Sequence, residues 1–240
     1  MDVKIKTAII SVSNKENVVK FTKALSAMSV RIISTGGTAK ALEQAGVEVV
    51  SVESVTGFPE MMDGRVKTLH PRIHGALLGI RDKKDHAESM TRHNILPIDL
   101  VCVNLYPFEQ TIADPDCAFE DAIENIDIGG PSMLRSAAKN HQYVTVVTSP
   151  DQYDMIIEQM KTNNGAIDQR LRTELARRAF DQTASYDAAI SKYLNRRDNI
   201  EFPDKVSVSL LKQHELRYGE NPHQAAAYYK LPLISETSVS

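Results

Sequence analysis

The sequence has no tryptophan, only two cysteines and no apolar run long enough to cross a membrane. Cys102 and Cys117 are far apart and belong to no ligand-like spacing, which argues against a disulfide framework or a thiolate metal site. The net charge of −3 gives no electrostatic reason to expect nucleic acid binding. The N-terminus runs into a strand-like segment without a charged and apolar leader. We therefore expect a cytoplasmic protein that binds neither membranes nor nucleic acids and holds no metal.

The 240 residues, 42% hydrophobic and 25% charged, are ordinary for a globular protein and suffice for one large domain. Short β-branched and apolar segments alternate along the chain with segments of helical periodicity. This alternation predicts an α/β fold, a Rossmann-like parallel sheet with helices on both faces that binds its ligand at the carboxyl ends of the strands. Strands are predicted at residues 7–13, 30–34, 47–52, 99–105 and 143–148.

The remaining chain suggests where the domain ends. Residues 53–81 break the alternation and are predicted to be a functional loop. A long helical stretch over 167–196 predicts additional helices at the C-terminal side of the sheet, and the composition beyond residue 199 is loop-like. We therefore predict a domain over 1–198 and a linker with the start of another domain over 199–240.

A Gly-Gly-Pro sequence at 129–131 predicts a helix that begins at Pro131. The unpaired amides of its first turn would form a cradle for an anion or a carbonyl oxygen. Asp127, just before the cradle, is a candidate base, and Lys139, about two turns into the helix, is a candidate acid. The alternative is that Asp127 is an N-cap-region carboxylate and Lys139 a solvated cation at a helix end.

A second glycine turn, Ser-Thr-Gly-Gly-Thr at 34–38, lies between a predicted strand and a predicted helix. Its amides and hydroxyls suit a phosphate at a helix N-terminus, although it lacks the Walker lysine and so does not imply ATP hydrolysis. Lys15, at the end of the first strand, would face the same crevice. The alternatives are a tight connection without a ligand and an exposed lysine.

Four more residues are candidates for the same crevice. Arg65 and Lys67 form a cationic pair that an anion or a proton-transfer task would explain, and the alternative is a solvated loop face. Asn104 and Tyr106 end a strand where the ligand is expected, although such a tyrosine often only covers the core.

Two histidines, His70 and His74, have the separation of a helical metal pair. Pro71 and the lack of a third ligand nearby argue against a metal site. We expect them to be loop or packing residues.

Six ordered segments resemble the N-terminal part of one family, the bifunctional purine biosynthesis proteins, which join an IMP cyclohydrolase domain to an AICAR transformylase domain. The resemblance continues to about residue 193 and resumes at 216–224, which is similar to the opening of the transformylase domain. The matching segments are 34–38, 56–61, 64–71, 104–108, 126–130 and 135–140.

This resemblance implies a methylglyoxal-synthase-like fold and closure of the second ring of FAICAR, with loss of water, to give IMP. It implies no cofactor for this step, and 10-formyltetrahydrofolate as co-substrate only of the transformylase domain, whose catalytic Lys-His segment the sequence does not contain. The full-length family protein is expected to be a homodimer. Competing possibilities are a phosphate-responsive regulatory domain of the same fold and a methylglyoxal synthase.

By the same resemblance, Lys15, Ser34, Thr35, Gly36, Gly37 and Thr38 would hold the 5′-phosphate. Catalysis would involve Asp127 as proton acceptor, Lys67 and Tyr106 in proton transfer, and Lys139 with amides near Ile128 and Gly129 at the oxyanion. The residues expected around the base are Arg65, Lys67, Thr68, Asn104, Tyr106, Asp127 and Lys139.

Overall fold

The structure is a computed structural model that describes residues 1–231. The chain divides into two compact units, Met1–Thr183 and Ala184–Ser240. The division falls inside the long helix α10 (Gln169–Arg197), whereas the sequence predicts a boundary after residue 198. The last nine residues of the predicted segment 199–240 lie outside the described residues.

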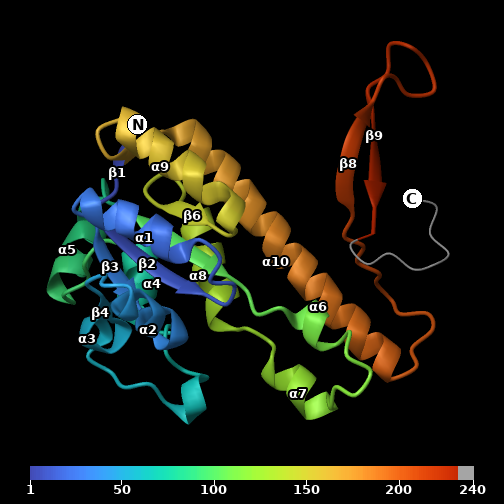
Figure 1. Cartoon of the computed structure of the whole chain (residues 1–240), viewed down its shortest axis with the longest axis horizontal. Coiled ribbons are helices and arrows are strands. Elements are labelled where there is room, and N and C mark those ends of the chain that lie inside the picture. The colour runs from blue at the N-terminus through green and yellow to red at the C-terminus, as the bar shows by residue number, and fades with distance from the viewer. Residues whose placement is uncertain (232–240) are drawn as a thin grey trace. The chain divides into compact units, whose positions relative to one another are not determined.

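A five-stranded parallel sheet forms the centre of the first unit (Figure 1). Its order is β4-β3-β2-β5-β6, and Ile10 of β2 pairs with Ser34 on one side and with Cys102 on the other. This confirms the predicted α/β fold, although the third predicted strand is only two residues long. The strands are β2 (Thr7–Val12), β3 (Arg31–Ser34), β4 (Val50–Ser51), β5 (Leu100–Asn104) and β6 (Thr145–Val147).

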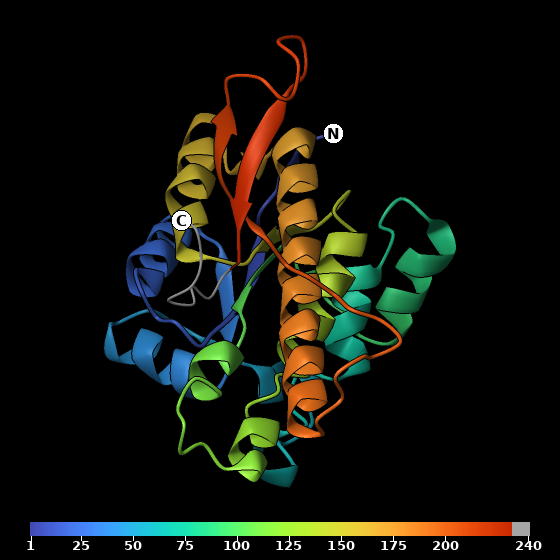
Figure 2. The same ribbon diagram turned by 90° about the vertical axis from the view of Figure 1, so that its right-hand side faces the viewer.

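Helices cover both faces of this sheet, as Figure 2 shows. Helices α1 (Val18–Ala27), α2 (Gly36–Gln44) and α9 (Tyr153–Thr162) lie on one face. Helices on both faces explain why the central strands are apolar on both sides: the neighbouring residues Ile9 and Ile10 of β2, whose side chains point to opposite faces, are both fully buried. The other face carries α4 (Pro71–Leu78), α5 (Lys84–Arg92) and α8 (Gly129–Lys139).

The prediction of a loop over 53–81 is wrong in part, because this stretch contains most of α3 (Val52–Thr56), the 3-10 turn η1 (Met62–Gly64) and α4. Pro71 is the first residue of α4, where a missing N–H is tolerated. His70 caps that helix, since its Nδ1 accepts a hydrogen bond from the Arg72 N–H at 3.1 Å. Local capping therefore builds a helix where the residue pattern suggested a break.

Arg172 of α10 is fully buried and fastens the N-terminus to the rest of the first unit. Its guanidinium donates to the carbonyl oxygens of Met1 at 2.8 Å, His141 at 2.9 Å and Gln142 at 3.0 Å, and also to that of Ile167. These bonds adjoin a small antiparallel pair, β1 (Val3–Lys4) with β7 (Ala166–Ile167). No sequence pattern had singled out this residue.

The described part of the second unit contains an antiparallel hairpin of β8 (Leu211–Leu216) and β9 (Ala226–Lys230). The rings of His214 and Tyr228 face each other across it with centroids 5.5 Å apart. Within residues 1–231 no helix combines the length and apolarity that crossing a bilayer requires. The remaining short elements are α6 (Phe108–Thr111), α7 (Phe119–Glu124) and η2 (Pro150–Gln152).

Candidate functional site

A cavity of about 660 Å³ opens where β2, β3 and β5 end. Its walls come from the start of α2, the 60–68 segment, the turn after β5 and the start of α8. Such a volume is ordinary for a small-molecule site. The predicted site residues that line it are Lys15, Thr35, Gly36, Gly37, Thr38, Arg65, Lys67, Thr68, Asn104, Tyr106, Asp127, Ile128 and Gly129.

Two predicted site residues do not line this cavity. Ser34 is fully buried, and its hydroxyl donates to the Ile10 carbonyl at 2.7 Å. This hydroxyl therefore stabilises the pairing of β3 with β2. Lys139 is exposed at the last position of α8. Ten residues of helix carry it roughly 15 Å from Gly129. The expectation that Lys139 faces the same cleft as Thr38 is therefore not met in this chain, and Lys139 occupies the end-of-helix position of the alternative interpretation.

The turn before α2 has the features of an anion cradle. Gly36 has φ of +55°, which only glycine adopts readily, and α2 begins there. Thr35 is 8% exposed, and its hydroxyl has no hydrogen-bond partner within the described chain. The Lys15 and Lys67 ammonium groups lie 3.7 and 3.5 Å from the positions that Cβ atoms on Gly37 and Gly36 would occupy. Helix amides, a spare hydroxyl and two cations thus meet at one turn.

The polar groups of the Thr38 and Asn104 side chains form hydrogen bonds with the protein backbone. The Thr38 hydroxyl accepts from the Val12 N–H at 3.0 Å and donates to the Val12 carbonyl at 2.9 Å. The Asn104 side-chain oxygen accepts from the N–H groups of Ser13 and Asn14 at 2.7 and 2.9 Å, and its amide donates to the Asn14 carbonyl at 3.0 Å. Both residues shape the cavity by holding the end of β2.

Asp127 is a half-buried carboxylate in the cavity wall near the start of α8. It accepts hydrogen bonds from the backbone N–H of Gly130, at 2.8 Å, and from the backbone of Tyr106. Burial raises the pKa of Asp127, although the two backbone hydrogen bonds oppose the shift. The carboxylate therefore caps the helix, as the alternative interpretation expects, and also has the raised proton affinity that suits a base.

The two glycines that begin α8 are required by close approach. The helix begins at Gly129, two residues before the predicted Pro131. A Cβ atom on Gly129 would lie 2.7 Å from the Thr68 hydroxyl oxygen, and one on Gly130 would collide with the Asp127 carboxylate. Glycine at both positions lets the 60–68 segment and Asp127 pack against the helix start.

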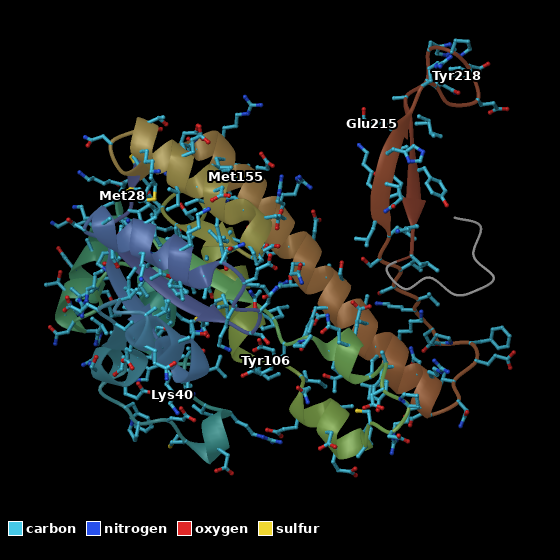
Figure 3. All side chains as sticks on the ribbon, in the orientation of Figure 1. Met28, Lys40, Tyr106, Met155, Glu215 and Tyr218 are labelled. Carbon is cyan, nitrogen blue, oxygen red and sulfur yellow. The ribbon has the colours of Figure 1, made fainter. Side chains whose placement is uncertain are left out.

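Tyr106 and Ile128 stand at the exposed side of the cavity. Their exposed fractions are 50% and 57%. Figure 3 shows Tyr106 at the end of the sheet, in the turn that follows β5. A ligand that enters the cavity would cover both side chains.

Sequence reasoning missed three carboxylates, Glu60, Asp63 and Glu124, that also line the cavity. Glu60 forms an ion pair with Lys67, and Glu124 forms one with Arg65. The Glu124 carboxylate raises the pKa of Arg65, and the guanidinium in turn lowers the pKa of Glu124. The signal was present in the predicted excess of cations at 65 and 67, which calls for counter-ions, but their positions could not be read from the sequence.

The two histidines, His70 and His74, contact helix residues. His74 places its Nδ1 3.0 Å from the Ser136 hydroxyl of α8, and burial lowers its pKa. In the part of the chain that the structure describes, no group of three or more His, Cys, Asp or Glu side chains is placed to hold a metal ion.

Comparison with known proteins finds two family models along the chain. A family model described as the MGS-like domain matches residues 17–132, and one described as the AICARFT/IMPCHase bienzyme matches residues 137–239. The bifunctional purine biosynthesis protein PurH of Bacillus mycoides (strain KBAB4) is 52% identical over 235 residues, 98% of this chain. The chain belongs to the bifunctional purine biosynthesis protein family.

Members of the PurH family extend further than this chain. The PurH of Bacillus cereus (strain G9842) is 53% identical over 98% of the chain, which covers 46% of that relative, so the chain spans about half the length of the curated relatives it matches. The crystal structure of ForH superposes with a TM-score of 0.69 at 33% identity and covers 78% of this chain and 97% of its own. The methylglyoxal-synthase-like fold implied by the sequence is thereby confirmed.

Proposed function

We propose that this PurH-family chain is an IMP cyclohydrolase, which closes the second ring of FAICAR with loss of water. One observation supports this most directly: the cavity that has an anion cradle at Thr35, Gly36 and Gly37 also has a half-buried carboxylate, Asp127, in its wall. A nucleotide has the matching parts, a phosphate at one end and a base at the other.

In this proposal the 5′-phosphate binds at the start of α2. The helix amides and the unpartnered Thr35 hydroxyl donate to its oxygens, and Lys15 and Lys67 supply positive charge. Thr38 and Asn104 keep the turn and the end of β2 in place through their bonds to the backbone. Ser34 supports the sheet below the turn without touching the ligand.

The ring closure is intramolecular, so the enzyme has to hold one rotamer and stabilise charge. The carboxamide nitrogen attacks the formyl carbon and forms the new N–C bond. Asp127 accepts the proton that this nitrogen loses. The formyl oxygen then leaves as water, with one hydrogen from each of the two nitrogens. Lys67 and Tyr106, which line the same cavity, are assigned to these later proton transfers.

We assign the oxyanion contacts to amides at Ile128 and Gly129. Lys139 is left out of this assignment because it does not line the cavity, and the Gly130 amide is left out because it already bonds Asp127. Arg65 and Thr68 are assigned to the base-binding wall. The reaction is neither redox nor energy-requiring, so no cofactor is proposed. By family resemblance, 10-formyltetrahydrofolate would serve only a transformylase domain, and a homodimer is proposed for the full-length protein.

A phosphate-binding regulatory module is the second candidate. The anion cradle is complete without Asp127, and such a module would need only the cradle. It would use Asp127 only as the cap of α8, and the raised pKa of this carboxylate would have no role.

Incubation of the purified chain with FAICAR, followed by chromatographic measurement of IMP, separates the two. We expect conversion by the wild-type chain and little by Asp127→Asn, with similar IMP affinity in both. IMP binding without any conversion by the wild-type chain would instead support the regulatory module.

A further inference from the structure

Glu60 and Lys67 face each other across a short hairpin that projects from the cavity wall. The hairpin is closed by an antiparallel bridge, in which the Met61 N–H donates to the Val66 carbonyl at 3.1 Å and the Val66 N–H donates back at 3.3 Å. Glu60 and Lys67 are the next residues on either side of this bridge. The backbone therefore sets them opposite each other, and their side chains form an ion pair.

The turn of this hairpin leaves room for the pair. Three successive residues have positive φ, namely Met62 at 55°, Asp63 at 54° and Gly64 at 94°. A Cβ atom on Gly64 would lie only 2.9 Å from a Glu60 carboxylate oxygen and 3.9 Å from the Lys67 ammonium. Glycine at this position is what allows the carboxylate to reach the lysine.

The pair is oriented with its cation toward the cradle. The Lys67 side chain is 19% exposed and its ammonium borders Gly36, whereas the Glu60 side chain is 41% exposed. A lysine side chain has four flexible carbons and little directional preference. Glu60 therefore limits where the Lys67 ammonium can go.

A carboxylate at this place is costly for anion binding. Glu60 lines the same cavity as the proposed phosphate cradle, and like charges separated by about 4 Å repel by ~1 kcal/mol even at the dielectric constant of water. A site that only bound phosphate would bind better with a neutral residue here. We therefore expect the Glu60 carboxylate to have a role other than phosphate affinity.

We propose that Glu60 is a positioning residue that holds the Lys67 ammonium beside the start of α2, in competition with the phosphate of the bound nucleotide. This inference rests on the proposed function for its effect on turnover, but its effect on anion binding is independent of it. Glu60 touches no reacting atom and acts through Lys67.

Opposite effects on binding and on turnover follow from this role. In Glu60→Gln the side chain keeps its length and loses its charge. The dissociation constants for inorganic phosphate and for IMP should fall roughly fivefold, because one repulsive charge is removed. The kcat for FAICAR should fall about tenfold, since the mobile lysine is no longer held in place. A merely structural role would weaken binding and turnover together.

A second variant of Glu60 separates the effect of its charge from the effect of its side-chain length. Glu60→Asp keeps the charge but is one methylene shorter, so we expect the kcat to fall without tighter phosphate binding. Glu120→Gln is the matched control, because it removes the same charge from an exposed carboxylate of α7 that does not line the cavity. It should leave both quantities unchanged.

The experiment measures phosphate and IMP binding by calorimetry, kcat and KM with FAICAR, and thermal midpoints for all variants, each also in a Lys67→Met background. Glu60→Gln should have no further effect on kcat in that background. Weaker phosphate binding in Glu60→Gln, an unchanged kcat, or a kcat loss that persists without Lys67 would each overturn the inference. If the wild-type chain made no IMP, the proposed function would fail, and the direction of the calorimetric change would still decide the role of Glu60.

Discussion

The Asp127 carboxylate accepts a hydrogen bond from the Gly130 N–H at 2.8 Å, so the group that we assign as base also caps the first turn of α8. This bond fixes the carboxylate at the helix start, beside the amides of Ile128 and Gly129 that the proposal assigns to the oxyanion. A single short segment thereby places the proton acceptor and the oxyanion donors within one wall of the cavity.

The first prediction concerns removal of the base. Asp127→Asn should lower kcat for FAICAR by about 100-fold, because general base catalysis contributes about 10²–10⁴. The IMP dissociation constant should change little, since the proposal assigns the phosphate contacts to the start of α2 and not to Asp127. Steady-state kinetics and calorimetry check both, and near-normal turnover would contradict the assignment.

The second prediction concerns pH. Burial raises the pKa of Asp127 above the ordinary value of 3.8, and the base must be ionised to act. The activity should therefore fall on the acid side at a pH above 3.8, and this acid limb should vanish from the residual activity of Asp127→Asn. A profile of kcat/KM against pH for both chains tests this, and an identical acid limb in both would assign it to another group.

The third prediction compares two threonines of one turn. Thr35→Val should weaken phosphate binding by roughly tenfold, because one hydrogen bond is lost, yet raise the free energy of unfolding by about 1 kcal/mol, because a buried unpaired hydroxyl is removed.

Thr38→Val should have the opposite effect on stability. It breaks both bonds to Val12 and should lower the free energy of unfolding by about 1–3 kcal/mol. Urea denaturation and calorimetry measure the pair side by side. Equal stability changes would contradict the difference in hydrogen bonding between the Thr35 and Thr38 hydroxyls.

The fourth prediction concerns acid stability. Burial lowers the pKa of His74 below 6.5, so the unfolded chain binds this proton more readily than the folded chain. The stability is therefore complete above pH 6.5 and is lost as the pH falls through 6.5 toward the folded-state pKa. His74→Asn should lose less stability than the wild type between pH 7.5 and 5.5 in urea denaturation. The exposed His93→Asn variant is the control and should behave as the wild type does.

The fifth prediction concerns Arg172. Arg172→Met leaves four carbonyl oxygens, of which that of Ile167 is buried, without their donor and should lower the free energy of unfolding by about 3 kcal/mol or more. Arg170→Met, at an exposed position of the same helix, should change it by less than about 0.5 kcal/mol. Urea denaturation provides both values, and equal losses would refute the anchoring role.

Much of the architecture could be predicted because its signals are local. Strands β2 and β5 are apolar on both faces, and glycine turns at 36–37 and 129–130 begin helices, so the parallel sheet and the two walls of the cavity follow from short segments. The family resemblance predicts Arg65, Lys67 and Thr68 at the ligand, and all three line the cavity. The sequence predicts a functional loop here and no hairpin, because three residues with positive φ, of which only Gly64 is a glycine, give no periodic pattern.

The sequence by itself determined the fold class, the family and most of the residues at the carboxyl edge of the sheet. Only the tertiary structure decided how those residues are used. Helix rise carries Lys139 away from the cavity, pairing across a hairpin brings Glu60 to Lys67, and backbone contacts engage the hydroxyls of Ser34 and Thr38. The hydroxyl bonds join residues 24 and 26 positions apart, and the Glu60–Lys67 pair depends on positive φ angles in the intervening turn, so neither is encoded in a periodic local pattern.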